Sequence, residues 1–491
     1  MNRYTIRTRQ FFGPLCLVVT AILICQGIVW PPCAMANQPA SPQAAGAGWK
    51  AAVASAVITP EEPMWMAGYA SRNKPSEGKI HDLNAKVLAL EDQQGTRLVI
   101  VTVDLLGIPR ATRDWLEEQV GQRYKLGPQA LLLSASHTHS GPVVREAQYS
   151  IYGNTLYGLS PEQIQQSNRY VENLQQKLLE MIGQAIENLA PANLGYTHAR
   201  AGFAMNRRLP SETGYRNSPN PDGPVDHDVP VLRIDGPDGK LRALLFGYAC
   251  HNTTLSGYEF CGDYAGFAQQ YVQEMHPEAT AMFIAGCGAD QNPYPRGGPQ
   301  TLEYCKQHGR ALANGVETAL AIQARPVDGP IRAAFDTVTL DFADPPSREQ
   351  LQEQTKSKDK YEVRHAQVLL KELDEKGTIR KTYPYLVQVV RFGSDLTMIA
   401  LAGEVVVDYS LRLKSELRGP GSSGPAIWVA GYCNDVFGYI PSVRVLREGG
   451  YEAGEAMRYT DLPGPFAPSI EERIIAKVHE LVDKTAASKS K

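Results

Sequence analysis

LLLSASHTHSGP, residues 131–142, joins a strand-like apolar run to a polar end that contains two histidines. Side chains of an extended chain alternate between its two faces, so His137 and His139 are predicted to point to the same side. Two neighbouring imidazoles repel each other when both are charged, and a bound metal ion holds them neutral. The alternative is a strand end with two solvated histidines, and this stretch alone does not decide between the two interpretations.

The segments on either side of this stretch alternate between strand and helix patterns. The apolar run 97–107 predicts a buried strand, and the amphipathic segment 111–124 after it predicts a helix. Other predicted elements are a helix from 161 to about 189, a hairpin at 228–251, helices at 263–275 and 301–320, a strand at 279–286, a charged helix or helix pair at 348–377, strands at 385–393, 396–403 and 426–431, and a helix from about 469. This alternation predicts an α/β chain whose sheet is not purely parallel.

The first 36 residues have the pattern of an export signal. Arg3, Arg7 and Arg9 precede a long apolar run, and "CAMAN" offers a small-residue cleavage site after Ala36. The apolar run is long for a signal peptide, so an uncleaved N-terminal anchor is the alternative. We therefore expect an exported protein that is periplasmic, secreted or anchored in a membrane. The Pro/Ala/Gly-rich segment 37–50 is predicted to be a flexible spacer.

The rest of the chain has the size and composition of one large domain. Residues 51–485 show no internal repeat and no central linker, and residues 486–491 are expected to form a disordered tail. The net charge of −3 and the lack of a basic run argue against nucleic acid as a partner. Five of the eight cysteines lie beyond the leader, which allows at most two disulfides and one free thiol. None is spaced as CxxC, which argues against a zinc site made of thiolates.

Polar residues follow several apolar strands at the points where the strands are predicted to end. His251 follows "LLFGYAC", and Glu404 interrupts the apolar stretch "LTMIALAGEVVV". A carboxylate there has to be paired, protonated or bound to a cation, unless it simply begins a helix at the glycine turn. Asn434, Asp435 and Tyr439 follow another strand. Two or three histidines with one carboxylate are the usual ligands of catalytic zinc, although this scattered spacing matches no short motif.

Taken in order, "SASHTHSGP", "MNRR", "YACHNTTLSG", "LAGE" and the segment around Tyr439 resemble the catalytic domain of the neutral/alkaline non-lysosomal ceramidases. The resemblance runs from about Val57 to the C-terminus. It implies a single large catalytic domain in which layered mixed β-sheets are flanked by helices. Members of this family are zinc amidases of sphingolipid metabolism that cleave the N-acyl bond of ceramide. The implied substrate is therefore ceramide or another N-acyl lipid, and association with a membrane surface stays open.

The resemblance also implies the roles of individual residues. The implied zinc ligands are His137, His251, Glu404 and Tyr439. His139 would then face the substrate or the attacking water and carry the proton to the leaving amine. Arg207 in "MNRR" matches an active-site arginine of the family that would steady the oxyanion, with an ordinary ion pair as the alternative. Tyr451 in "GGYE" matches a pocket tyrosine, and zinc would lower the pKa of a bound water to about 7.

Two features depart from the family pattern. Ceramidases carry a Gly-Asp-Val-Ser-Pro-Asn segment whose serine is assigned a catalytic role, and the corresponding stretch here is "AGCGADQNPYPRG". Gln291 stands at the serine position and Ala289 at the aspartate position. Gln291 is kept as a candidate catalytic residue, but the missing hydroxyl favours attack by zinc-activated water over an acyl-enzyme. The chain also stops soon after Tyr439, so we expect no C-terminal immunoglobulin-like domain.

Three hypotheses follow from these observations. The first is an exported zinc-dependent amidohydrolase, similar to neutral ceramidase, that hydrolyses an N-acyl amide bond. The second is a zinc hydrolase of the same fold that acts on a non-lipid amide or an ester. The third is a non-catalytic metal-binding protein, in which loss of the family serine marks loss of turnover.

Overall fold

The computed structural model describes residues 48–144, 156–418 and 424–486. All of them belong to one compact unit. The predicted leader 1–36 and residues 487–491 of the predicted tail lie outside the described residues. Residues 37–47 of the predicted spacer 37–50 also lie outside the described residues, and its last two residues, Trp49 and Lys50, belong to the first strand, β1, which spans Trp49–Val57.

The largest sheet has nine strands. They are β1, β3 (Asn84–Glu91), β4 (Arg97–Val103), β5 (Leu131–Ala135), β6 (Ala190–Arg200), β9 (Asp228–Asp235), β10 (Leu241–Tyr248), β12 (Thr280–Ala285) and β14 (Arg325–Pro326). Their order is β12-β10-β9-β6-β1-β3-β4-β5, with β14 paired to β6. The pairs β4–β5 and β10–β12 are parallel and the others antiparallel, so the sheet is mixed, as predicted.

A second sheet has four strands. They are, in order, β15 (Ile331–Asp341), β16 (Thr382–Phe392), β17 (Leu396–Leu401) and β19 (Ala426–Ala430), with β17 and β19 parallel. Short strands form three smaller sheets: β2 (Gly78–Lys79) with β11 (Glu259–Phe260), β7 (Ala204–Ser211) with β8 (Gly214–Asn220) and β13 (Gln291–Pro293), and β18 (Glu404–Val405) with β20 (Tyr439–Ile440).

The helices are α1 (Arg110–Tyr124), α3 (Pro161–Glu187), α4 (Asp263–Met275), α5 (Thr301–Ala321), α6 (Arg348–Gln354), α7 (Lys360–Lys376), α8 (Val407–Leu417), α9 (Val443–Glu448) and α10 (Ile470–Thr485). Every helix predicted from the sequence is present, and the charged segment 348–377 forms a pair, α6 and α7. Helices α8 and α9 were not predicted. Within the described ranges, no helix combines the length and the apolar character needed to cross a membrane.

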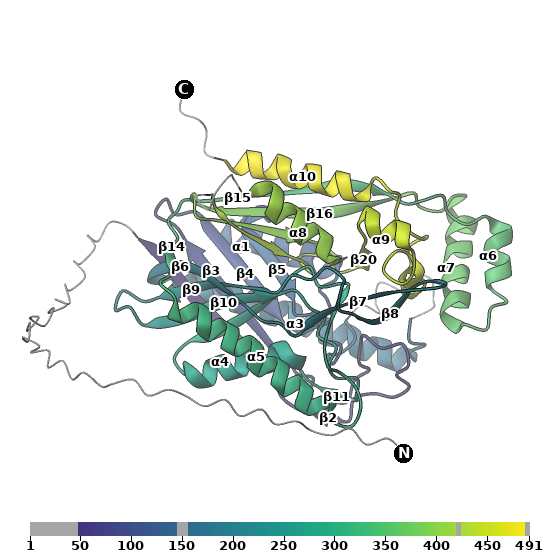
Figure 1. The fold of residues 1–491 in the computed structure, drawn as a ribbon, viewed down its shortest axis with the longest axis horizontal. Helices are drawn as coiled ribbons and strands as arrows, with labels where there is room; N and C mark the ends of the chain where they lie inside the picture. Colours follow the sequence, from purple (N-terminus) through teal and green to yellow (C-terminus); the bar gives the residue numbers. More distant parts are fainter. Residues whose placement is uncertain (1–47, 145–155, 419–423, 487–491) are drawn as a thin grey trace, which may run out of the picture. The chain divides into compact units, whose positions relative to one another are not determined.

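The two large sheets pack face to face, and helices cover their outer faces (Figure 1). Leu88 and Leu90 of β3 pack in the cluster between the sheets, whereas Val87 and Ala89 pack with α1 and α3. Helices α4 and α5 cover another part of that outer face, and α8 and α10 cover the four-stranded sheet. Both faces of the central strands are therefore buried, which explains why they read as unbroken apolar runs. The predicted layered α/β class is confirmed.

Three parallel strand pairs bring the polar strand ends together. Helix α1 connects β4 to β5, α4 lies between β10 and β12, and α8 lies between β17 and β19. His137 follows β5, His251 follows β10 and Glu404 follows β17. Isolated β-bridges link β5, and the residue after β12, to β19 and the residues after it. The carboxyl ends of strands from both sheets therefore meet at one edge, where α/β proteins commonly build sites.

A buried polar network holds the two sheets together near that edge. Arg113 is fully buried, and its Nη1 donates to the carbonyl of Leu131 at 3.1 Å and to Oδ1 of Asn434 at 2.9 Å. Oδ1 of Asn434 also accepts from the backbone N–H of Leu133, and its Nδ2 donates to Gln388 in β16 at 2.8 Å. Asn434 thus has a structural role at the junction of α1, β5 and β16.

Replacing Asn434 by alanine should destabilise the protein strongly. The variant leaves the buried guanidinium of Arg113 without one acceptor, and it places alanine at a φ of 64°, where asparagine is better tolerated. We expect Asn434→Ala to lower the free energy of unfolding by about 3 kcal/mol, measured by urea denaturation. The exposed Asn193→Ala is the matched control. Equal effects of the two substitutions would contradict the structural role of Asn434.

Candidate functional site

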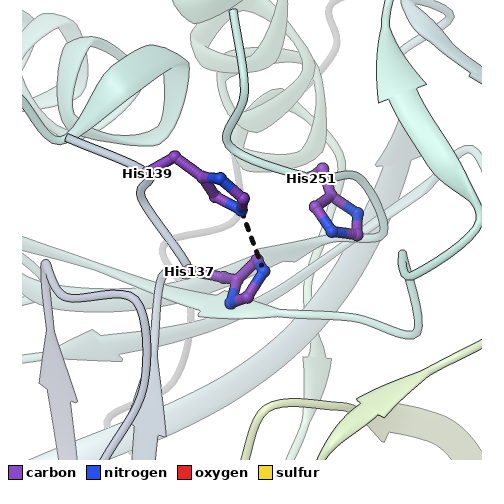
Figure 2. Close-up of side chains that lie close together, drawn as sticks. All are labelled: His137, His139 and His251. Carbon is purple, nitrogen blue, oxygen red and sulfur yellow. Dashed lines mark hydrogen bonds between the residues drawn. The ribbon is translucent and has the colours of Figure 1, made fainter. Parts of the chain in front are cut away.

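Three histidines and a glutamate converge at the shared edge of the two sheets. His137, His139 and His251 each offer a ring nitrogen, and these atoms all lie within 4.8 Å of one another (Figure 2). The Nε2 atoms of His137 and His251 each lie 3.2 Å from the same oxygen, Oε2 of Glu404. Nε2 of His139 lies 3.2 Å from Nε2 of His137. The structure therefore brings together four of the residues that the sequence singled out.

The two histidines of the opening stretch reach the site through a turn. β5 ends at Ala135, and His137 has a φ of 62°, in the left-handed region. Thr138 between them forms a β-bridge with Asn252 and donates its hydroxyl to the carbonyl of Cys261 at 2.7 Å. The prediction that both imidazoles face the same side holds, but strand alternation is not the reason for it. The turn at His137 places both rings above the strand end.

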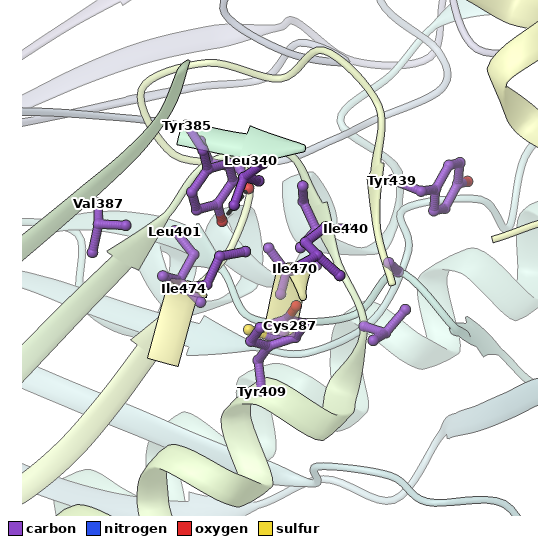
Figure 3. Close-up of a cluster of buried hydrophobic side chains, with 14 of the residues drawn as sticks. Cys287, Leu340, Tyr385, Val387, Leu401, Tyr409, Tyr439, Ile440, Ile470 and Ile474 are labelled. Carbon is purple, nitrogen blue, oxygen red and sulfur yellow. Dashed lines mark hydrogen bonds between the residues drawn. The ribbon is translucent and has the colours of Figure 1, made fainter. Parts of the chain in front are cut away.

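Tyr439 joins this group through the short strand pair β18–β20. Glu404 and Tyr439 are direct partners in that pair, and the N–H of Glu404 donates to the carbonyl of Gly438 at 2.8 Å. The hydroxyl of Tyr439 lies 3.4 Å from Nε2 of His251. Figure 3 shows Ile440, the next residue, inside the hydrophobic cluster, whereas Tyr439 lies at its edge. Strand alternation thus turns Tyr439 toward the imidazoles.

Arg207 is a buried ion-pair arginine that also contacts the site. Its Nε donates to Oε1 of Glu452 at 2.7 Å, its Nη2 to the hydroxyl of Tyr439 at 3.0 Å, and its Nη1 to Asn292 at 3.3 Å. Tyr451 packs beside Tyr439 with the ring centroids 5.4 Å apart. All three nitrogens of the guanidinium are engaged, so Arg207 acts on Tyr439. Glu452 was not predicted as a functional residue, although it directly follows Tyr451 in the sequence.

The ring nitrogens of the histidines are used differently. Nδ1 of His137 lies 2.6 Å from the carbonyl of Leu106, and Nδ1 of His251 lies 2.9 Å from the carbonyl of Gly288. A carbonyl only accepts, so both Nδ1 atoms carry the proton, which is how proteins orient metal-binding histidines. Nδ1 of His139 is buried and has no hydrogen-bond partner among the described residues. His139 therefore differs chemically from the other two.

The charges of the site favour a cation. Burial lowers the pKa of His251 to about 4, with a further contribution from Arg207, so His251 is neutral at pH 7. Burial alone would raise the pKa of Glu404, but His137 and His251 hold it well below its usual value. Nε2 of His251 thus presents a lone pair to an ionised carboxylate at 3.2 Å. Such acceptors repel each other unless a cation lies between them, and this donor set fits a metal ion.

A cavity of about 240 Å³ opens onto these groups. His137, His139 and Glu404 line it on one side. Its aromatic lining residues are Tyr69, Tyr157, Phe437, Tyr439, Tyr451 and Tyr459. The cavity is therefore lined by polar side chains that could hold a metal ion and by aromatic side chains, most of which carry a hydroxyl group.

Gln291 does not line this cavity. Its side chain is fully buried, with Nε2 donating to the carbonyl of Cys287 at 3.2 Å and Oε1 accepting from the N–H of Asp226 at 3.0 Å. Its backbone carbonyl accepts from the N–H of His251 at 2.9 Å. Oδ1 of the neighbouring Asp290 accepts from Val407 at the start of α8. The segment that replaces the family's serine motif therefore supports His251 and α8, and the structure does not place the Gln291 side chain among reacting groups.

The cysteines beyond the leader are all reduced. Cys250, Cys261, Cys287, Cys305 and Cys433 are buried and free, so the part of the chain that the structure describes contains no disulfide. Neither of the two bridges that the sequence allowed is formed.

The sequence matches known proteins in the region that holds the histidines. Residues 53–292 match the family model described as neutral/alkaline non-lysosomal ceramidase, N-terminal. Neutral ceramidase B of Dictyostelium discoideum is 26% identical over 253 residues, which are 47% of this chain and 33% of that protein. Neutral ceramidase A of the same organism is 26% identical over 254 residues, 47% of this chain and 34% of that protein. The match thus spans about a third of the length of these relatives.

Solved structures share the fold over most of the chain. The crystal structure of neutral ceramidase from Pseudomonas aeruginosa superposes with a TM-score of 0.69 at 18% identity, covering 90% of this chain and 76% of that chain. A ceramidase complexed with C2 gives a TM-score of 0.67 at 18% identity, covering 90% of this chain and 77% of that chain. Glu404, Tyr439 and Tyr451 lie beyond the family-model match, which ends at residue 292.

His251 should make the metal-free protein sensitive to acid. Its pKa falls from 6.5 to about 4 on folding, so between these values the unfolded chain binds a proton that the folded chain does not. Stability must therefore fall as the pH falls through this window. Because of His251, we expect the free energy of unfolding to fall by about 2 kcal/mol when the pH is lowered from about 7.5 to about 5. Urea denaturation with a chelator measures this loss.

The control for this prediction is His251→Gln, which removes the titrating group. Its pH dependence should be shallower by the same amount. An unchanged slope would show that His251 is protonated in the folded protein.

Proposed function

The chain belongs to the neutral/alkaline non-lysosomal ceramidase family, and on that premise we propose that it is an exported, zinc-dependent hydrolase of an N-acyl amide bond. The observation that carries the proposal is the convergence of Nε2 of His137 and Nε2 of His251 on one oxygen of Glu404. Ceramide, or a related N-acyl lipid, is the proposed substrate class because the matched relatives are neutral ceramidases.

The donor atoms are those that zinc prefers. His137, His251 and Glu404 would hold the ion, with Tyr439 as the fourth ligand, and the cavity side would stay open. When bound, zinc lowers the pKa of a water molecule to about 7 and polarises a carbonyl group. The hydrogen bonds from Nδ1 of His137 and His251 fix the rings so that both Nε2 lone pairs face the site.

Arg207 contributes by holding Tyr439. Its Nη2 donates to the phenol oxygen and opposes the effect of burial, which raises the pKa of Tyr439 well above its usual value. Glu452 balances the buried guanidinium with a 2.7 Å ion pair. Because the guanidinium does not line the cavity, we assign substrate positioning to Tyr451, which does.

His139 is the proposed proton carrier. Addition of water to the amide carbon forms a tetrahedral intermediate, and the carbon–nitrogen bond breaks only once the nitrogen is protonated. His139 lies on the cavity wall and takes the proton that the attacking water loses. It then gives this proton to the leaving nitrogen, so amide and water become a carboxylic acid and an amine. Gln291 takes no part, which removes any need for an acyl-enzyme.

A second candidate function is hydrolysis of a non-lipid amide or an ester. The cavity volume of about 240 Å³ favours it, because it lies below the range of pockets that enclose drug-sized ligands. A two-chain lipid would have to leave most of its hydrocarbon outside. The third candidate, a non-catalytic metal-binding protein, shares the donor set and differs only in turnover.

Metal removal and a substrate panel test the proposal. The purified protein should contain about one zinc per chain, and a chelator should abolish hydrolysis that added zinc restores. The panel compares N-acyl sphingosines, short N-acyl amides and carboxylic esters by release of the acid. We expect His251→Ala and Glu404→Gln to lose zinc and at least about 100-fold in turnover, because each removes a ligand. The exposed His198→Ala is the control.

Each outcome of this panel decides between the candidates. Turnover of short amides or esters without sphingosine amides would favour the second function. Bound zinc without turnover of any substrate would favour the third. An absence of bound metal at saturating zinc would overturn all three.

Restoring the family's serine should not increase activity. Gln291→Ser removes two buried hydrogen bonds and points its hydroxyl away from the cavity. We expect turnover no higher than that of the parent protein and a loss of about 1–3 kcal/mol of unfolding free energy. Intact-mass measurement during turnover should find no acylated protein. An acylated Gln291→Ser variant would contradict the assigned orientation of this side chain.

A further inference from the structure

The segment "MWMAGY" (64–69) contributes both to the core and to the cavity. Met64 and Met66 are buried in the cluster beneath the nine-stranded sheet. Gly68 and Tyr69 line the cavity beside His139. The structure therefore divides this segment between the core and the cavity.

Gly68 lies directly against the imidazole of His139. It has a φ of 99°, and a Cβ at this position would lie 2.6 Å from both Cγ and Nδ1 of His139. Carbon atoms do not approach this closely, so any side chain at residue 68 would displace the ring. Its N–H donates to the hydroxyl of Tyr157 at 3.0 Å, which holds the backbone in place.

Tyr69 and Arg72 complete the contact around His139. The Tyr69 ring packs on the imidazole with centroids 4.9 Å apart, and its hydroxyl donates to the carbonyl of Leu255 at 2.9 Å. Arg72 is buried and donates from Nη1 to the carbonyl of His139 at 2.7 Å and also to that of Ala67. Its guanidinium lies 4.9 Å from the centre of the Tyr69 ring. The turn at residues 68–72 therefore contacts both the ring and the backbone of His139.

Packing contributes to the orientation of His139, because its Nδ1 makes no hydrogen bond to a described residue and its Nε2 contacts only another imidazole, that of His137, at 3.2 Å. The two other imidazoles are fixed through Nδ1, whereas Nδ1 of His139 has no partner among the described residues. We propose that Gly68, Tyr69 and Arg72 are positioning residues that aim His139 at the leaving nitrogen. This inference rests on the proposed amide hydrolysis. It assigns to this turn a role in turnover that is separate from holding the metal.

The choice of substrate separates the two roles, holding the metal and protonating the leaving nitrogen. An alkyl amine departs only after its nitrogen accepts a proton, whereas a nitrophenolate leaves from an aryl ester without one. A displaced His139 should therefore slow amide hydrolysis and leave aryl ester hydrolysis nearly unchanged in assays above about pH 8, where a water bound to zinc would already have lost its proton. A general disturbance of the metal ligands would slow both reactions together.

Gly68→Ala is the decisive variant, because one methyl group occupies the place of the ring. We expect it to lower kcat on the amide by about 100-fold or more while KM changes little, since general acid–base catalysis commonly contributes this much. Aryl ester turnover and zinc content should stay near those of the parent. Gly239→Ala is the matched control, because Gly239 has a φ of 75° and an added Cβ there would meet no atom within 4 Å. It shares the backbone strain and lacks the collision.

A second pair of variants covers the case in which Gly68→Ala does not fold. Tyr69→Leu removes the ring that packs on His139 and should lower the amide-to-ester ratio, while Tyr69→Phe keeps the ring and should largely restore it. Equal losses on amide and ester at full zinc content, or no loss in Gly68→Ala, would overturn the positioning role.

A readout that does not need turnover separates this inference from the proposed function. Diethyl pyrocarbonate modifies neutral imidazoles, and peptide mass spectrometry locates the modified residue. In the metal-free protein, His139 should react faster in Gly68→Ala than in Gly239→Ala, whereas His137 and His251 should be unaffected. Unchanged reactivity of His139 would overturn the positioning role even if turnover falls. A parent protein that hydrolyses no amide overturns the proposed function, while this measurement still tests the packing.

Discussion

A buried carboxylate beside the lone pair of a neutral imidazole, that of His251, favours a bound cation, and the arrangement of this molecule follows from that constraint. Glu404 follows the apolar strand β17, and its Oε2 lies 3.2 Å from Nε2 of His137 and 3.2 Å from Nε2 of His251, which presents a lone pair. Desolvated acceptors this close together repel one another, so a cation among them would stabilise the cluster. Two sheets, three parallel strand pairs and a short ladder between Glu404 and Tyr439 all serve to hold these groups at one edge.

Much of the fold could be predicted because its central strands and amphipathic helices have strong local patterns. The runs at 97–107 and 396–403 are apolar on both faces, and the structure buries both faces between a second sheet and a helix layer. Helix α8 was missed because the residues that lead into it, Val405 to Val407, are as apolar as strand β17 before them. Strand partners between distant segments, such as β6 with β1 and β9, leave no local trace and could not be predicted from one sequence.

The candidate site was predicted in composition and only partly in geometry. Strand ends and the family resemblance singled out His137, His251, Glu404 and Tyr439, and the structure brings all four together. The left-handed turn at His137 could not be foreseen, because it depends on contacts with Cys261 and Asn252, more than a hundred residues away. Alignment placed Gln291 at a reactive position, but only the fold reveals that its amide serves backbone groups.

The strand pair β18–β20 sets the spacing between Glu404 and Tyr439 through the backbone, whichever side chains stand at the two positions. Main-chain hydrogen bonds set the distance between these two positions, at 2.8 Å from Glu404 to Gly438 and 3.2 Å from Val406 to Ile440. Side chains can therefore be exchanged at either rung while the backbone keeps its dimensions. For protein engineering, this two-residue ribbon is a ready template on which hard oxygen donors and softer nitrogen donors can be swapped to retune which metal the pocket selects.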